Sequence, residues 1–216
     1  MVGVRKRARR GVQLELPLPN TWGGRRTGAG RKPATPRRNV SHVVRPRHQR
    51  AHPVHVVLRS RVRSLRSQFM FPTLRRALAG ATRARADFRI VHFSVQSDHL
   101  HLIVEADTRL ALSRGMQGLA IRIAKRVNRL IFRRGTFWSD RFYARALTSP
   151  RTVKHAVRYV LNNFRKHGEV VRGSGDPCSS AEFASLLRRG VRSGKHEPIP
   201  ISPARTWLAR TCGASF

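Results

Sequence analysis

Acidic residues are scarce in this chain. Only 10 Asp and Glu stand against 45 Lys and Arg among 216 residues, which gives a formal net charge of +35. The scarcity excludes a site in which clustered carboxylates hold metal ions, because only Asp98, Glu105 and Asp107 lie close together and strand alternation does not collect them. A globular domain with such self-repulsion is typical of polyanion-binding proteins, so nucleic acid is the expected partner.

Cysteines and long apolar runs are also lacking. Cys178 and Cys212 are the only two cysteines, and their spacing fits neither a disulfide framework nor a zinc finger. No apolar run approaches the roughly 20 residues that span a bilayer, so no membrane association is expected. The basic N-terminus has no apolar segment after it, which excludes a visible signal peptide and predicts a cytoplasmic protein.

The length and the distribution of Gly, Pro and Arg predict one domain with two flanking segments. Residues 1–47 are rich in these three residue types and contain one acid, Glu15, so we expect a disordered basic arm. Residues 48–170 form the expected domain. Residues 171–216 return to Gly, Ser and Pro punctuation and are interpreted as a C-terminal tail.

Hydrophobic periodicity in the central part predicts the order strand, helix, strand, strand, helix, strand, helix. The strands are expected at 53–60, in two runs within 88–106, and within 135–147. The helices are expected from Pro72 to about residue 86, from Arg109 to about Ile131, and from Ser149-Pro150 onward. This is the split β-α-β pattern of an α+β, ferredoxin-like antiparallel sheet with packed helices, which is also the RRM-like fold.

Two histidines mark the second strand of the central hairpin. His99 and His101 are two residues apart, so their imidazoles emerge on one side of the strand, while Leu100, Leu102 and Val104 occupy the opposite, core-facing side. Neutral imidazole is a common metal ligand, and two histidines on one rigid strand can hold a metal ion. A half-buried pair bonded to its neighbours is the structural alternative for these residues.

The helix from Arg109 has an apolar stripe and a basic polar side, and the segment after it mixes aromatics with arginines. The basic side is either a solvated face or a nucleic-acid face, whereas the aromatics either stack on bases or belong to the core. We count as candidate DNA-binding residues Arg122, Lys125, Arg126, Arg129, Trp138, Arg141 and Lys166.

The last helix carries a tyrosine away from its apolar stripe. Its buried stripe is predicted to be Val153, Ala156, Val157, Val160, Leu161 and Phe164. Tyr159 and Asn163 are four residues apart and share one flank of this helix, roughly 100 to 140° from the stripe centre. The other tyrosine, Tyr143, lies in a predicted strand and has no such partner.

His-Leu-His at 99–101 resembles the His-hydrophobic-His motif of HUH nucleases, and Tyr-Val-Leu-Asn-Asn at 159–163 resembles the nucleophile helix of single-tyrosine transposases. In particular, residues 47–168 are similar to the REP-associated tyrosine transposases of bacteria. Many relatives place a proline after the asparagine, whereas Phe164 follows Asn163 here and lets the helix continue.

The resemblance implies a metal-dependent DNA-cleaving and strand-joining enzyme with the HUH endonuclease fold. It implies Tyr159 as the nucleophile, His99, His101 and Asn163 as ligands of Mg²⁺ or Mn²⁺, and single-stranded or hairpin DNA as substrate, with a 5′-phosphotyrosine intermediate. A non-catalytic nucleic-acid-binding protein, either RRM-like or a host-retained hairpin-DNA binder, is the alternative. The target hairpin and its cleavage sequence stay open, as do the choice between monomer and homodimer, between an active site in cis or in trans, and between an active and a domesticated enzyme.

Overall fold

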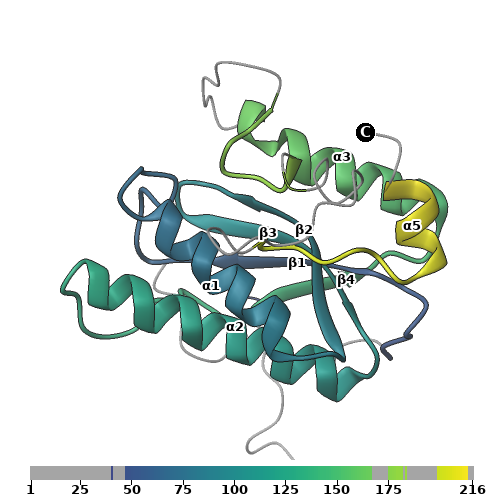
Figure 1. Cartoon of the computed structure of the whole chain (residues 1–216), viewed down its shortest axis with the longest axis horizontal. Coiled ribbons are helices and arrows are strands. Elements are labelled where there is room, and N and C mark those ends of the chain that lie inside the picture. Colours follow the sequence, from purple (N-terminus) through teal and green to yellow (C-terminus); the bar gives the residue numbers. More distant parts are fainter. Residues whose placement is uncertain (1–39, 41–46, 167–174, 182, 184–198, 214–216) are drawn as a thin grey trace, which may run out of the picture. The chain divides into compact units, whose positions relative to one another are not determined.

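The computed structural model describes residues 40, 47–166, 175–181, 183 and 199–213, which belong to the compact unit formed by residues 39–216 (Figure 1). The elements are β1 (Val54–Arg59), α1 (Phe71–Ala84), β2 (Phe88–Val95), β3 (His99–Ala106), α2 (Arg109–Leu130), β4 (Tyr143–Ala146), α3 (Pro150–Lys166) and α5 (Trp207–Gly213). Up to α3 this is the order that the sequence predicts. The expected basic arm, residues 1–47, lies outside the described residues except for Val40 and Arg47.

The four strands form one antiparallel sheet in the order β2-β3-β1-β4. β1 and β3 are therefore the central pair, with Val57 opposite His101 and Arg59 opposite His99. The predicted α+β class with a ferredoxin-like antiparallel sheet is confirmed. The strand order follows from the split β-α-β pattern, which places the first and third strands side by side.

Helices α1 and α2 cover one face of the sheet and enclose the larger core (Figure 1). Leu100, Leu102 and Val104 point into this core from β3, as their alternation predicts. Helix α2 approaches the sheet closely at Gly115, where an added Cβ would lie 2.3 Å from the Phe88 ring. A larger residue at position 115 would therefore push α2 away from β2.

Helix α3 covers the opposite face with a smaller apolar cluster. Ile103 of β3 and Val91 of β2 pack there with Val153, Val157 and Val160, the centre of the apolar stripe of α3. Leu208 and Cys212 of α5 join the same cluster, so α5 packs beside α3. The two faces of the sheet thus carry separate cores, and the odd-numbered residues of β3 belong to the face covered by α3.

The described parts of the C-terminal segment, which the sequence suggested as a tail, pack on the sheet. Asp176 accepts two hydrogen bonds from the Arg66 guanidinium at 2.8 and 3.0 Å, and Ser179 forms a bridge to Ser94 of β2. Glu105 accepts hydrogen bonds from the backbone N–H groups of Arg205 and Thr206 just before α5. Gly, Ser and Pro punctuation gave no sign of this packing, because the partners are more than 80 residues away in sequence.

Within the described residues, none of the helices combines the length and the apolarity that a membrane crossing requires.

Candidate active site

The side chains of His99 and His101 emerge from β3 on the sheet face that α3 covers. Both are almost fully buried, with 7% and 5% exposure, and their ring centroids lie 4.9 Å apart at nearly right angles. The strand alternation that predicted a shared face is confirmed. Rigid placement on a central strand keeps the two imidazoles at a constant separation.

Each of these histidines is held through its Nδ1 atom. The Nδ1 of His99 lies 2.6 Å from Oδ1 of Asp98, whose other oxygen lies 3.6 Å from the Arg59 guanidinium. The Nδ1 of His101 lies 3.1 Å from Nε2 of His55 on β1. Metal-binding histidines in proteins usually have one ring nitrogen held in this way, which orients the other nitrogen toward the metal. Nε2 is therefore the nitrogen that each ring offers as a ligand.

His55 is a member of the site that sequence reasoning treated as an ordinary strand residue. Its ring stacks on His101 with centroids 5.4 Å apart and an interplanar angle of 18°. Burial, assisted by the nearby Arg145 guanidinium, lowers the pKa of His55 to about 4, so the ring is neutral at physiological pH. The signal was available, because His55 alternates with Val54, Val56 and Leu58 and faces away from the larger core.

Tyr159 of α3 lies against the histidines from the helix side, above the sheet face from which they emerge. Its ring centroid lies 5.2 Å from that of His101 and 6.0 Å from that of His55, in edge-to-face arrangements. Tyr159 thus packs at the edge of the α3 cluster and faces the sheet. The helical spacing placed it farther round, on a flank outside the buried stripe. Tyr143 on β4 is the other tyrosine, and it is about half exposed. It pairs with Val57, so β1 separates it from His101, at about 10 Å by the usual strand spacing.

Asn163 lies one turn beyond Tyr159 and is 1% exposed. Its side-chain oxygen and nitrogen are both buried, and neither has a hydrogen-bond partner among the described residues. A buried amide without partners costs free energy, so its presence in α3 needs another explanation. A cation that binds the amide oxygen would satisfy part of this need, and the residues present fit a metal ion in this respect.

The candidate metal ligands are two imidazoles and one amide. In the described part of the chain no group of three or more His, Cys, Asp or Glu side chains is arranged to hold a metal ion. The candidate site therefore depends on Asn163 as the third protein ligand and leaves coordination positions for oxygen atoms of a substrate or of water.

The candidate DNA-binding residues of α2 lie in the other layer. Helix α2 packs with α1 on the sheet face opposite to α3, so Lys125, Arg126 and Arg129 are exposed on the side away from His101. Arg122 is half-buried, and its guanidinium lies close to Gly80 of α1. The structure does not bring these residues to Tyr159, and their role in DNA binding stays a prediction.

The remaining candidates have mixed placements. The indole N–H of Trp138 donates a hydrogen bond of 3.0 Å to the Ala120 carbonyl of α2, and the ring packs against the larger core. Arg141 is half-buried just before β4. Lys166 is the last residue of α3, and its side chain lies outside the described part of the structure. Trp138 thus has a structural contact that its sequence context did not reveal.

Fold and site together define an α+β domain with a histidine pair on a central strand and a tyrosine on the helix that covers it. A family model described as "Transposase IS200 like" matches residues 48–163, more than half of the chain. The chain therefore belongs to the IS200-like transposase family, and the resemblance to single-tyrosine transposases is confirmed at this level. No curated protein sequence matches the chain significantly.

Several solved chains have a similar fold. One of them is described as a REP-associated tyrosine transposase bound to a REP hairpin, and it aligns with a TM-score of 0.56 and 20% sequence identity. The alignment covers 77% of this chain and 93% of that one. At this identity the similarity concerns the fold, and it agrees with the predicted architecture.

Proposed function

We propose that this transposase cleaves and rejoins single-stranded or hairpin DNA through a covalent link to Tyr159. The observation that carries the proposal is the contact between the Tyr159 ring and the His101 ring, 5.2 Å between centroids, at the side of a histidine pair held through Nδ1. The DNA-bound solved relative of similar fold supports hairpin DNA as the substrate class. A REP-like hairpin is therefore the first substrate to test.

In the proposed reaction the Tyr159 hydroxyl oxygen attacks the phosphorus of a DNA phosphodiester. The new bond joins this oxygen to phosphorus as the hydroxyl gives up its proton, the bond to the 3′ oxygen breaks, and that oxygen takes up a proton and leaves as a 3′-hydroxyl. The 5′-phosphotyrosine link keeps the energy of the broken bond, so a 3′-hydroxyl can reverse the step and rejoin a strand. Tyr159 is half-buried, so its ring lies against His101 while part of the side chain stays accessible to solvent.

His99, His101 and Asn163 would hold a divalent metal ion, Mg²⁺ or Mn²⁺. A bound ion supplies Lewis-acid stabilisation of charge on the phosphate oxygens. The chain's own contribution is orientation, because Asp98 and His55 hold Nδ1 of the two histidines. Orientation of the bound ion matters for a tyrosine nucleophile, because a neutral phenol is a weak attacking group.

The test is a search for the protein–DNA link. Labelled hairpin DNA with single-stranded flanks is incubated with the protein and Mn²⁺ or Mg²⁺, and a denaturing gel shows whether label migrates with the protein. We expect an adduct with the unmodified protein and with Tyr143→Phe, and none with Tyr159→Phe or in excess EDTA.

Two outcomes would contradict the proposal. An adduct that persists in Tyr159→Phe but is lost in Tyr143→Phe would assign the nucleophile to β4. Tight hairpin binding without an adduct, over a panel of hairpins with varied flanking tetranucleotides, would favour a DNA-binding protein without cleavage activity.

A further inference from the structure

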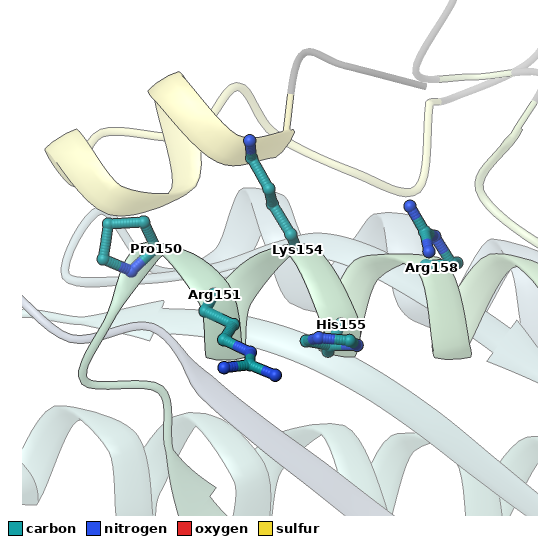
Figure 2. Close-up of a pocket in the computed structure, with 5 residues that line it drawn as sticks. All are labelled: Pro150, Arg151, Lys154, His155 and Arg158. Atoms are coloured by element: carbon teal, nitrogen blue, oxygen red, sulfur yellow. The ribbon is translucent and has the colours of Figure 1, made fainter.

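Four basic side chains line a hollow on the outer side of α3. Arg151, Lys154, His155 and Arg158, together with Pro150, surround a space of about 290 Å³ (Figure 2). All four are exposed, and they recur at the three- and four-residue spacing that places side chains on one helix face. We call these four residues the α3 basic face.

This face adjoins the flank that carries the proposed nucleophile. At about 100° per residue, the α3 basic face lies roughly opposite the apolar stripe, and Tyr159 lies on the side next to it. His155 is one turn before Tyr159, and Arg158 directly precedes it. A strand joined to Tyr159 reaches these side chains within one helical turn.

The electrostatic setting of this face favours anions. Helix α3 contains no Asp or Glu. The described acids nearest the site already have partners: Asp98 contacts Arg59 and His99, and Glu105 accepts hydrogen bonds from Arg205 and Thr206 at the start of α5. Asp107 pairs with Arg89, and Asp176 pairs with Arg66. The positive end of the helix dipole also lies at Pro150, beside Arg151. No acid within α3 therefore offsets the charges of this face.

The basic residues of α2 have a different position. They lie beyond the opposite face of the sheet, behind the larger core, whereas α3 lies on the side of the histidines (Figure 1). A single strand bound at Tyr159 reaches α3 directly but must pass around the domain to reach α2. Proximity to the site therefore distinguishes two helices that look equally basic in the sequence.

We propose that the α3 basic face binds backbone phosphates of the DNA segment that becomes joined to Tyr159, which is the segment on the 3′ side of the cleaved bond. The inference rests on the proposed function for the identity of that segment. From Arg151 to Arg158 the face is about 10 Å long, the length of seven residues of α helix. Arginine and lysine side chains along this length contact phosphates without reading bases, so the face positions the strand independently of its sequence.

The test compares two variants that lose the same charge from opposite sides of the sheet. One is Arg151→Ala/Lys154→Ala/Arg158→Ala on α3, and the matched control is Lys125→Ala/Arg126→Ala/Arg129→Ala on α2. All six residues are exposed, so both variants keep their cores. Binding of a labelled hairpin with a 3′ single-stranded extension is measured in EDTA at several salt concentrations, so that no cleavage occurs.

Loss of three phosphate contacts to a single strand should reduce the slope of log affinity against log salt by about 2 and weaken binding about 100-fold at 0.1 M salt. We expect this for the α3 variant on the 3′-extended hairpin and a much smaller effect on a blunt hairpin. The α2 control should change both DNA molecules alike and by less. Equal losses in the two variants, or an α3 effect that ignores the 3′ extension, would overturn the inference.

The adduct assay separates this inference from the proposed chemistry. If the α3 variant shows the selective binding loss but no protein–DNA link ever forms, the binding face stands and the nucleophile assignment fails. If the link forms at Tyr159 and the α3 and α2 variants bind equally, the chemistry stands and the face is wrong. Nuclease digestion of the trapped adduct gives a second measurement. In the unmodified protein we expect a stretch of protected nucleotides that follows the linked phosphate, and in the α3 variant we expect this protected stretch to be shorter.

Discussion

The buried amide of Asn163 is unfavourable for folding but suitable for binding a metal ion. Neither its oxygen nor its nitrogen has a hydrogen-bond partner within the described residues. Replacing it with leucine, which has a similar shape, removes an unsatisfied polar group. We therefore expect Asn163→Leu to raise the free energy of unfolding of the metal-free protein by about 1 kcal/mol, measured by urea denaturation in EDTA.

The same variant should lose the stabilisation that a bound metal supplies. Mn²⁺ that binds only the folded protein raises its melting temperature, and Asn163→Leu should show little of this rise. Asn162→Leu is the matched control, because Asn162 is the preceding residue and its amide donates to the Arg158 carbonyl at 3.0 Å. An equal Mn²⁺ response in both variants would remove Asn163 from the ligand set.

His55 should affect metal affinity without being a ligand. The variant His55→Phe keeps a ring stacked on His101 but removes the contact at Nδ1. Loss of such a supporting contact typically weakens metal binding by about 10 to 100-fold. Calorimetric titration of Mn²⁺ into the two proteins measures the difference. His155→Phe, on the exposed face of α3, should leave the Mn²⁺ affinity unchanged, and an unaltered affinity in His55→Phe would contradict the positioning role.

The lowered pKa of His55 should also make the free energy of unfolding depend on pH. Its pKa is about 4 in the folded protein and about 6.5 when unfolded, so the unfolded chain binds more protons between these values. The stability that neutral His55 contributes to the folded protein is fully present above pH 6.5. It is lost as the pH falls toward 4, which lowers the free energy of unfolding by about 3 kcal/mol at most. Urea denaturation in EDTA from pH 7 to pH 4 should show a shallower decline for His55→Phe than for the unmodified protein. Parallel curves would argue against a buried neutral ring.

At the scale of elements, one buried carboxylate holds the start of α5, in addition to the apolar contacts of Leu208 and Cys212. Glu105 is 2% exposed and accepts hydrogen bonds from the N–H groups of Arg205 and Thr206 and from the Thr206 hydroxyl, at 2.7 to 3.0 Å. These donors lie at the N-terminus of α5, where a negative charge is favourable.

We expect Glu105→Ala to lower the free energy of unfolding by about 3 kcal/mol and to increase hydrogen exchange in α5 more than in α1. Asp87→Ala is a suitable control, because Asp87 pairs with Arg85 near the surface. Uniform exchange changes across both helices would show that α5 is held by other contacts.

The sequence predicted the elements well because its signals there are local. Alternation in β3 placed His99 and His101 together, and the spacing in α3 placed Tyr159 and Asn163 on one flank. What the sequence did not reveal arises from contacts between distant segments. His55 reaches His101 only through the pairing of β1 with β3, and Glu105 reaches Thr206 across a hundred residues.

The helix faces show the same limit. Periodicity identified a basic side on α2 but not which layer α2 occupies. A helix has the same periodicity whichever face of the sheet it covers. Only the observed packing therefore shows that Lys125 and Arg126 lie away from the histidines. In a chain with this much positive charge, a basic helix face attracts phosphate wherever it lies. Its distance from the candidate active site has to come from the structure.

At the scale of the whole molecule, we expect the N-terminal segment to add affinity without chemistry. Residues 1–47 carry many basic side chains and a single acid, Glu15, whereas the candidate site lies entirely between residues 55 and 163. A protein that begins at residue 48 should bind single-stranded DNA more weakly and with a smaller salt slope, yet still form the Tyr159 adduct. Fluorescence anisotropy and the adduct gel measure the two quantities. Loss of the adduct at saturating DNA would show that the segment takes part in catalysis.

The packing of α5 against α3 bears on how related genes are interpreted. The match to the family model ends at residue 163, before α5, which packs on the tyrosine helix through Leu208 and is held to β3 by Glu105. A gene copy interrupted after codon 170 would still encode every matched residue and would look intact in a genome survey. Its product would lack the support of the helix that carries Tyr159. Counts of intact copies of such genes should therefore require the reading frame to extend through the codons for α5.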